Sequence, residues 1–312
     1  MADFVMHCLF GEDVIGSLDE RAGKVAAYYR KAFNWGLQGP DILMAHHFVT
    51  GGDEITEAGF TLHKKNLDEL FSAGAHNCLK AGNAALSRCM QAYFYGFICH
   101  YALDSMIHPY VSARIEEKIA EGPDDDDRML HAQIETDMDM LLYEKRTGHK
   151  IHTFPLSDRY SWGLDLKRGR LLNGAIERFY VPVLRDVYDL PATEQEIREC
   201  IHSLMHLVAL QYNIPQTARM IGEVITPDPT EKRRRMARIK YREPEWDALN
   251  LSHAKWTGLR GEEHTESVPD ILEEAKEKAV LLTGRYTQMF RNHRIEKLHY
   301  DLDFSGSPIF PL

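Results

Sequence analysis

Residues 96–109 read GFICHYALDSMIHP, and this stretch decides both the fold class and the kind of site. Most of its side chains are apolar, yet His100, Asp104 and His108 recur at every fourth position. In an α-helix that spacing places two imidazoles and a carboxylate on one face. Burying these groups together without a partner would leave polar atoms unsatisfied, whereas Zn²⁺ binds this set of nitrogen and oxygen ligands. The stretch therefore predicts a buried helix that carries metal ligands.

The apolar positions in the rest of the chain also follow the helical repeat, and strand-like alternation is scarce. The clearest helical windows are 13–33, 67–73, 84–108, 127–145, 166–187, 194–223 and 269–290. We therefore expect an all-α fold, a multi-helix bundle around a multinuclear zinc site.

Several boundaries carry chemical signals. Pro109 indicates that the central helix ends at His108, and Thr193 with Glu196 forms a capping box ahead of a helix. Residues 36–62 read as a long loop that contains glycines, and residues 226–266, with three prolines, read as an exposed excursion. Candidate ligands become rare after about Tyr160, so we expect a metal-binding domain over 1–160 and a helical C-terminal region over 161–312 packed on it.

More candidate ligands lie on either side of the central stretch. His131 and Glu135 are again four residues apart, which lets two side chains on one helix reach the same ion. On its own this pair would read as an exposed helix pair. Three further donors lie upstream: Asp41 after a Gly-Pro pair, His63 at the start of a helical segment, and His7 in an apolar stretch.

Two other pairs of histidines allow more than one interpretation. His46 and His47 follow Asp41 in the same loop, where they could line a substrate cleft or equally belong to a solvated loop. His202 and His206 share a helix face without a carboxylate in register, so we interpret them as core or packing histidines.

The composition is that of a globular protein, with 44% hydrophobic and 27% charged residues. The formal net charge is -10, from 47 acidic and 37 basic residues, so no stable nucleic-acid binding is expected. A phosphate ester remains an acceptable substrate, because several bound Zn²⁺ ions would reverse the sign of the local field.

The sequence also gives expectations about the compartment. Met1 to Phe10 lacks the features of a signal peptide, and the five cysteines form no CxxC pair, so we expect a cytoplasmic protein with reduced thiols. The most apolar window, 92–103, is about half the length of a membrane span, so no transmembrane helix is expected. The basic cluster 232–240 could meet an anionic membrane surface, although a solvated excursion is the better interpretation. The oligomeric state is left open.

Together, the candidate ligands resemble those of a known family, the bacterial zinc-dependent phospholipases C, which are related to fungal single-strand nucleases with the same trinuclear zinc site. The resemblance covers roughly the first 145 residues. The strings that carry it are His7-Cys8-Leu9-Phe10-Gly11, Gly36-Leu37-Gln38-Gly39-Pro40-Asp41, Leu62-His63, residues 96–110 and His131-xxx-Glu135. The order of the ligands makes the match specific, since each short string alone is common.

The resemblance implies two to three zinc ions. One is held by Asp41, His63, His100 and Asp104; a second is held by His108, His131 and Glu135; a third is held by His7, with Asp104 as the bridge. Secreted relatives complete the third site with the amine and carbonyl of an N-terminal Trp. This chain begins Met1-Ala2, so the Ala2 amine would have to take that place.

The implied activity is phospholipase C-like hydrolysis of a phosphodiester by metal-activated water, with Asp41 as the catalytic carboxylate that assists proton removal. Phe60 fits one aromatic position around a lipid head group, but Ile42 does not fit another, so choline specificity does not follow. The alternatives are a nuclease-type phosphodiesterase or phosphomonoesterase of the same superfamily and a non-catalytic, metal-stabilised helical scaffold. An HD-domain phosphohydrolase is disfavoured, because the chain has no His-Asp dipeptide.

Overall fold

The structure is a computed structural model, and it describes residues 4–47, 51–121, 127–161, 165–209, 244 and 246–309. Within these ranges the regular structure is almost entirely helical, which confirms the all-α prediction. Two short strands, β1 (Trp256–Thr257) and β2 (Glu263–His264), pair antiparallel.

The described residues form two compact units, each discontinuous in sequence. The larger unit takes its residues from 7–108, 155–205 and 272–312, and the smaller unit from 1–6, 109–154 and 206–271. We describe each unit by itself. The predicted division into 1–160 and 161–312 stays a prediction.

Most helices belong to one unit. Those of the larger unit are α2 (Glu20–Tyr28), α3 (Arg30–Gly36), α4 (Asp41–Met44), α5 (Glu54–Leu62), α6 (Leu67–Lys80), α9 (Leu156–Tyr160) and α10 (Leu166–Tyr188). The smaller unit holds α8 (Asp127–Thr147) and the 3-10 turn η2 (Ile151–Thr153). The helices α1 (Phe4–Ile15), α7 (Ala84–Glu121), α11 (Glu194–Val208) and α14 (Val268–Arg291) contribute residues to both.

Three boundary predictions are wrong, each for a local reason. The window 13–33 is divided among α1, α2 and α3, because the Asp19 side chain accepts hydrogen bonds from the amides of Arg21 and Ala22 and starts a new helix. The region 36–62 is not one long loop, since it contains α4 and α5. The central helix does not end at His108 but continues through Pro109 to Glu121. The continuation has a cost, because proline cannot donate one backbone hydrogen bond and its ring crowds the carbonyl four residues earlier.

Two side-chain caps mark helix starts in the larger unit. Asp53 caps α5 in a capping box with Thr56, a signal that the sequence reading missed. The predicted box of Thr193 and Glu196 is present, with each side chain bonded to the other residue's amide, and it precedes α11. The excursion predicted over 226–266 lies partly outside the described residues, and its described end carries β1 and β2.

Glycines let α3 and α7 approach each other at backbone distance. A Cβ atom on Gly36 would lie 1.9 Å from the carbonyl oxygen of Tyr93, and one on Gly96 would lie 2.1 Å from that of Phe33. Because no side chain fits at this crossing, the segment that leaves α3 is held directly against α7. This contact brings the Gly39-Pro40-Asp41 turn to the face of α7 that carries His100.

The same turn is fixed from its other side by aromatic residues. The Tyr180 hydroxyl on α10 donates to the Gly39 carbonyl at 2.6 Å, and the Gln38 amide donates to the Tyr160 hydroxyl at 2.8 Å. Gly39 has a φ of +45°, and a Cβ there would lie 2.1 Å from Cδ2 of His100. Only glycine meets both conditions without strain.

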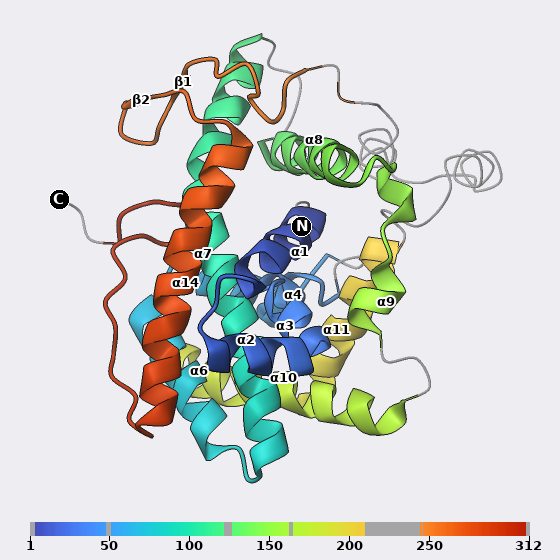
Figure 1. The fold of residues 1–312 in the computed structure, drawn as a ribbon, viewed down its shortest axis with the longest axis vertical. Coiled ribbons are helices and arrows are strands. Elements are labelled where there is room, and N and C mark those ends of the chain that lie inside the picture. Colours follow the sequence, from blue (N-terminus) through green and yellow to red (C-terminus); the bar gives the residue numbers. More distant parts are fainter. Residues whose placement is uncertain are drawn as a thin grey trace. The chain divides into compact units, whose positions relative to one another are not determined.

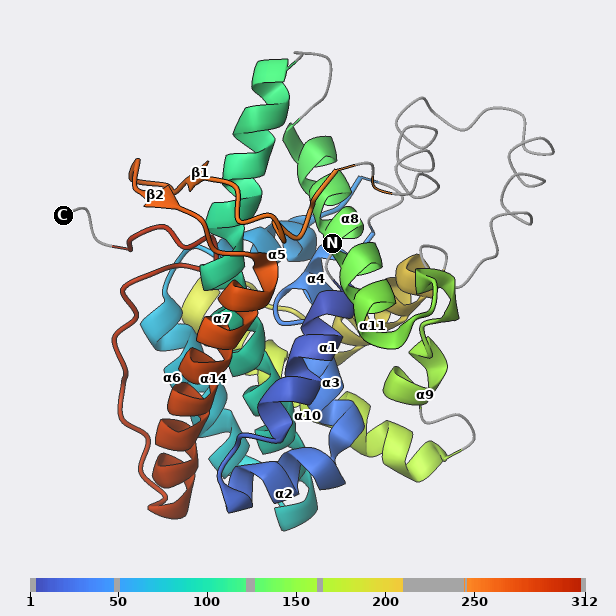
Figure 2. The ribbon, with the colours of Figure 1, turned by 45° about the horizontal axis from the view of Figure 1, so that its top comes forward.

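An aromatic core supports the larger unit, where α14 runs beside α7 (Figure 1 and Figure 2). Phe94 on α7 packs edge to face against Tyr286 and Phe290 on α14, with ring centroids 4.9 and 6.0 Å apart. Phe179 on α10 stacks into the same core against Phe97, at 5.1 Å. Apolar packing of this density keeps the helices that carry the candidate ligands in a fixed arrangement.

In the smaller unit, buried acids on α8 accept hydrogen bonds from other segments. Asp139 accepts from the amides of Val5 and Met6, at 3.1 and 2.7 Å, and so caps the first turn of α1. Asp137 accepts from the Trp246 indole at 2.7 Å. Across the described residues, we find no helix that is both long enough and apolar enough to cross a membrane.

Candidate metal centre

The buried face of α7 is the base of the site in the larger unit. His100 and Asp104 are almost fully buried, and Nε2 of His100 lies 3.1 Å from Oδ2 of Asp104. His108, one turn further, is partly exposed, and its Nδ1 lies 4.0 Å from the same oxygen. The helix therefore presents one carboxylate oxygen, Oδ2 of Asp104, between two imidazoles.

His7 on α1 meets the other oxygen of Asp104. Its Nε2 lies 3.0 Å from Oδ1, and its ring stacks on that of His100 with centroids 4.3 Å apart. Asp104 thus has one oxygen directed at His7 and the other at His100. A carboxylate whose two oxygens face different imidazoles has the arrangement needed to join two ions.

Asp41 and His63 complete the group. Asp41 is the first residue of α4, and His63 directly follows the last residue of α5. Nε2 of His63 lies 3.2 Å from Oδ1 of Asp41 and 3.8 Å from Oδ2 of Asp104. Both side chains are partly exposed, so this is the more open side of the cluster.

Backbone carbonyls orient three of the imidazoles. Nδ1 donates to the Gly59 carbonyl in His63 (2.7 Å), to the Leu37 carbonyl in His100 (3.1 Å) and to the Phe304 carbonyl in His108 (2.8 Å). A carbonyl only accepts, so each Nδ1 carries a proton, and Nε2 is the nitrogen left to face a metal or a carboxylate. Metal-binding histidines commonly have this second hydrogen bond, which sets the tautomer and the ring direction.

Two observations indicate that the described residues fit a zinc cluster. Buried Nε2 of His100 and Oδ1 of Asp104 make no hydrogen bond within the described part of the chain, although such atoms are costly to leave unsatisfied. The distances of 3.0 to 3.2 Å between neighbouring donor atoms are close to the edge of about 3.4 Å expected for a tetrahedron with zinc bonds of about 2.1 Å.

Charge interactions keep the carboxylates ionised. Burial alone would raise the pKa of Asp104, but His100, His108 and His7 lower it well below its usual value. Burial also acts to raise the pKa of Asp41, and the hydrogen bond from His63 together with nearby His100 lowers it overall. The pKa of His63 is raised, because its contacts with Asp41 and Asp104 outweigh burial. The cluster therefore favours negative carboxylates that can bind cations.

His131 and Glu135 belong to the smaller unit, where Nε2 of His131 lies 2.6 Å from Oε1 of Glu135 on α8. The predicted zinc set that joins them to His108 spans both units, and it stays a prediction. The Ala2 amine, which would have to take the place of the N-terminal Trp of secreted relatives, lies outside the described residues.

The residues predicted to contact substrate lie on or near α5. Phe60 is 43% exposed, His46 is buried, and His47 is exposed. Their contact with substrate stays a prediction. His202 and His206 are exposed, so their interpretation as core residues is wrong.

Sequence reasoning missed Phe304, which lies close to three candidate ligands. Its carbonyl accepts from His108, and its amide donates to the His63 carbonyl at 3.0 Å. Its buried ring packs 4.9 Å from that of His63 and 5.7 Å from that of His100. No local pattern around Phe304 marks this role, since the contacts come from segments about 200 residues away.

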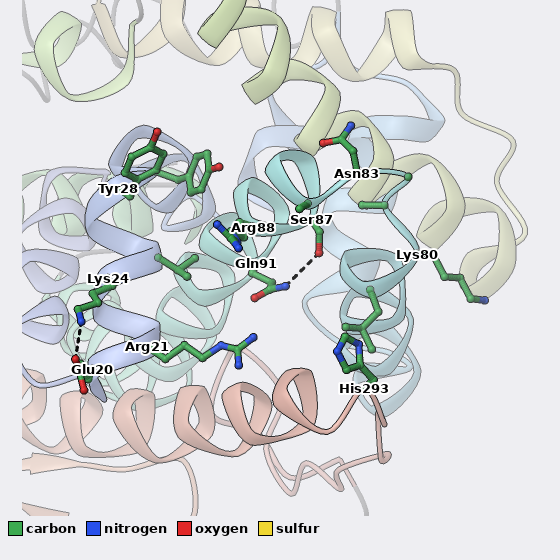
Figure 3. Close-up of a pocket in the computed structure, with 16 residues that line it drawn as sticks. Glu20, Arg21, Lys24, Tyr28, Lys80, Asn83, Ser87, Arg88, Gln91 and His293 are labelled. Atoms are coloured by element: carbon green, nitrogen blue, oxygen red, sulfur yellow. Dashed lines mark hydrogen bonds and ion pairs between the residues drawn. The ribbon is translucent and has the colours of Figure 1, made fainter.

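A cavity of the larger unit lies elsewhere. Figure 3 shows this cavity of about 1080 Å³, which is lined by α2 and by residues around the start of α7. Arg21 and Arg88 lie along it, and Lys24 pairs with Glu20. None of the candidate ligands lines it, so it is separate from the cluster.

The chain is all-α and gathers histidines and aspartates from several helices around the Asp104 carboxylate, an arrangement that could hold metal ions. The family comparison names the class more closely. The sequence model of the family described as zinc dependent phospholipase C matches residues 6–188, more than half of the chain, and the chain belongs to this family. Neither a curated protein nor a solved structure matches at a significant level. At the family level, membership supports a zinc-dependent hydrolase of phosphodiesters with a phospholipid-type substrate.

Proposed function

We propose that the protein hydrolyses the phosphodiester bond of a phospholipid in the manner of a phospholipase C. The observation that carries this proposal is the position of Asp104, whose two oxygens lie 3.0 Å from His7 and 3.1 Å from His100. Buried donors of this kind suit zinc, and zinc is the metal of the family.

The proposed ligand assignment follows the clusters. Asp41, His63, His100 and Asp104 would hold one ion, and His7 would share Asp104 with another. His108, His131 and Glu135 remain the proposed set for a further ion, which makes two to three in all. Bound zinc would supply a water of lowered pKa and positive charge for the phosphate oxygens.

Asp41 is the proposed general base. Its side chain is 16% exposed, whereas that of Asp104 is 3% exposed, so Asp41 is the carboxylate that a water and a substrate can reach. Its lowered pKa keeps it ionised at neutral pH, as a proton acceptor must be. The hydrogen bond from His63 holds it in place.

The head group is the least constrained part of the proposal. Phe60 offers an exposed aromatic ring on α5, whereas Ile42, at the other position compared with the family, is aliphatic and buried. We propose Phe60 as a contact for the alcohol part of the substrate, and the contacts predicted for His46 and His47 stay predictions. The net charge of -10 disfavours a nucleic-acid substrate, the second candidate.

A zinc measurement combined with a substrate panel tests the proposal. The full-length protein should carry two to three zinc ions and cleave phosphatidylcholine or phosphatidylethanolamine faster than phosphomonoesters or single-stranded DNA. Cleavage restricted to nucleic acid would replace the lipase with a nuclease. Zinc-loaded protein that cleaves nothing in the panel would favour the non-catalytic scaffold, and protein without zinc would remove the proposal.

A further inference from the structure

A second group of histidines and carboxylates lies in the larger unit and shares no residue with the Asp104 cluster. His46 and His47 follow α4, Asp53 caps α5, and Glu199 lies on α11. One donor atom from each of His46, His47 and Glu199 lies within 4.8 Å of the others. Three segments of the chain therefore bring nitrogen and oxygen donors to one place.

His46 is the centre of this group. Its side chain is 2% exposed, and its Nδ1 lies 2.8 Å from Oδ2 of Asp53. With an ionised carboxylate as acceptor, the proton is on Nδ1 and the lone pair is on Nε2. Nε2 is buried and makes no hydrogen bond among the described residues, and it lies 3.5 Å from Oε2 of Glu199.

The orientation of Asp53 is fixed independently of His46. Its Oδ1 accepts from the amides of Ile55 and Thr56, at 3.1 and 3.2 Å, as the cap of α5. Oδ2 of Asp53 is therefore available to face Nδ1 of His46. A carboxylate that holds the far nitrogen of a histidine is the usual support behind a metal-binding imidazole.

His47 adds a second imidazole on the same side. Its ring stacks on that of His46 with centroids 4.1 Å apart and an angle of 22° between the planes. Consecutive residues usually direct their side chains apart, and the left-handed φ of +47° at His47 allows this stacking. The side chains of His47 and Glu199 are 56% and 45% exposed, so an ion could enter from solvent.

We propose that His46, His47 and Glu199 bind a divalent ion of the zinc type, with Asp53 as the residue that orients His46. Two imidazoles and a carboxylate are a common zinc set that leaves one position for water. The 3.5 Å between Nε2 of His46 and Oε2 of Glu199 is close to the edge of about 3.4 Å in a tetrahedral zinc site. The ion would tie α11 to the α4–α5 connection.

The same contacts suit a different arrangement without a metal, in which Asp53 pairs with His46 and His47 and Glu199 pairs with His46. The two arrangements respond differently to metal. A zinc site is stabilised when zinc is added, because an ion that binds only the folded state raises its stability. An ion pair between side chains gives no such response.

Glu199→Gln in the full-length protein tests the proposal, because Glu199 is half exposed and its replacement leaves the packing intact. Zinc per chain is measured by elemental analysis after equilibrium dialysis against zinc, and the melting temperature is measured with and without the metal. We expect Glu199→Gln to bind about one zinc fewer than the wild type. We also expect its melting temperature to rise less on adding zinc. His202→Gln, which removes an exposed histidine from the same helix, should behave like the wild type in both measurements.

The zinc count of Glu199→Gln does not depend on the phospholipase proposal, because the loss of ions from the Asp104 cluster is measured separately with Asp104→Asn. In that background Glu199→Gln should still lower the zinc count by about one. An unchanged zinc count and an unchanged response to zinc in Glu199→Gln would overturn the proposal. A melting temperature lowered equally with and without zinc would assign the group to the ion pairs instead.

Discussion

The carbonyl oxygen of Phe304 accepts a hydrogen bond from Nδ1 of His108 at 2.8 Å. Phe304 lies outside residues 6–188, the part of the chain that the family model matches. The C-terminal segment therefore orients a candidate metal ligand, although the resemblance that predicts the ligands does not extend to it.

Replacing Phe304 should weaken both the fold and the centre. Phe304→Ala removes a buried ring that packs on His63 and His100, so we expect a loss of about 3–5 kcal/mol in the free energy of unfolding. Zinc affinity should fall as well, because the segment that holds His108 is loosened. Urea unfolding and competitive zinc titration measure the two effects. Phe304→Leu is the control and should keep most of the free energy of unfolding and most of the zinc affinity. Normal zinc affinity in Phe304→Ala would limit Phe304 to a packing role.

Asp104 should be the most important single ligand. Asp104→Asn removes a charge that two histidines share, so we expect zinc affinity to fall at least about tenfold more than in His7→Ala, a difference of about 1.4 kcal/mol. Zinc released to a chelator measures the ranking. Asp137→Asn, in which a buried acid outside the candidate set is changed, controls for the loss of a buried carboxylate. The reverse ranking would show that Asp104 does not bridge.

Asp41→Asn separates catalysis from metal binding. The amide is nearly isosteric and keeps an oxygen, but it loses basicity, so turnover should fall at least about a hundredfold, the low end for a general base. The comparison uses the best lipid substrate, with zinc measured on the same sample. Near-normal turnover at full zinc occupancy would assign water activation to another group.

Gly39→Ala tests the close approach of the turn to His100. Its Cβ would lie 2.1 Å from Cδ2 of the ring at a φ of +45°. Gly148 has a φ of +70° and nothing within 4 Å of its Cβ, so Gly148→Ala isolates the backbone cost of about 1–2 kcal/mol. We expect Gly39→Ala to lose a further 1–3 kcal/mol, roughly, from overpacking, and to bind zinc more weakly. Equal losses in the two variants would mean that the His100 ring moves aside without strain.

Lys278 should make stability depend on alkaline pH. Burial lowers its pKa from 10.5 to about 8, although Asp301 acts in the opposite direction. Between these two values the unfolded state binds more protons, so the free energy of unfolding should rise with pH, by at most about 1.4 kcal/mol per pH unit. Lys278→Met should remove this rise and should be at least as stable as the wild type at pH 7, despite losing the hydrogen bond to Ser105. Urea unfolding from pH 7 to 10 measures the slope, and exposed Lys255→Met should leave it unchanged.

Local patterns explain how much the sequence could predict. The spacing of His100, Asp104 and His108 depends only on helical geometry, so their common face followed from the sequence. The division of 13–33 at Asp19 and the helix that starts after Asp53 depend on side-chain caps. The sequence contains the residue types that form both caps, but local patterning alone did not single them out. The helix α7 continues through Pro109 against the local preference of proline, so the sequence pattern alone did not predict it.

Contacts between distant segments are what the sequence could not supply. Nothing near Phe304 indicates that it meets His63, and nothing near Glu199 indicates that it faces His46. Both pairs exist because the helices pack in a particular order. The sequence identified candidate donors by type, but their distances and the backbone groups that orient them required the structure.

The carbonyl groups behind His63, His100 and His108 belong to Gly59, Leu37 and Phe304, and a main-chain acceptor does not change when a side chain is replaced. As long as the fold is kept, a substitution at Gly59, Leu37 or Phe304 therefore leaves in place the carbonyl that directs the imidazole. Side chains around the candidate ligands could therefore be substituted while the three imidazoles keep their tautomers.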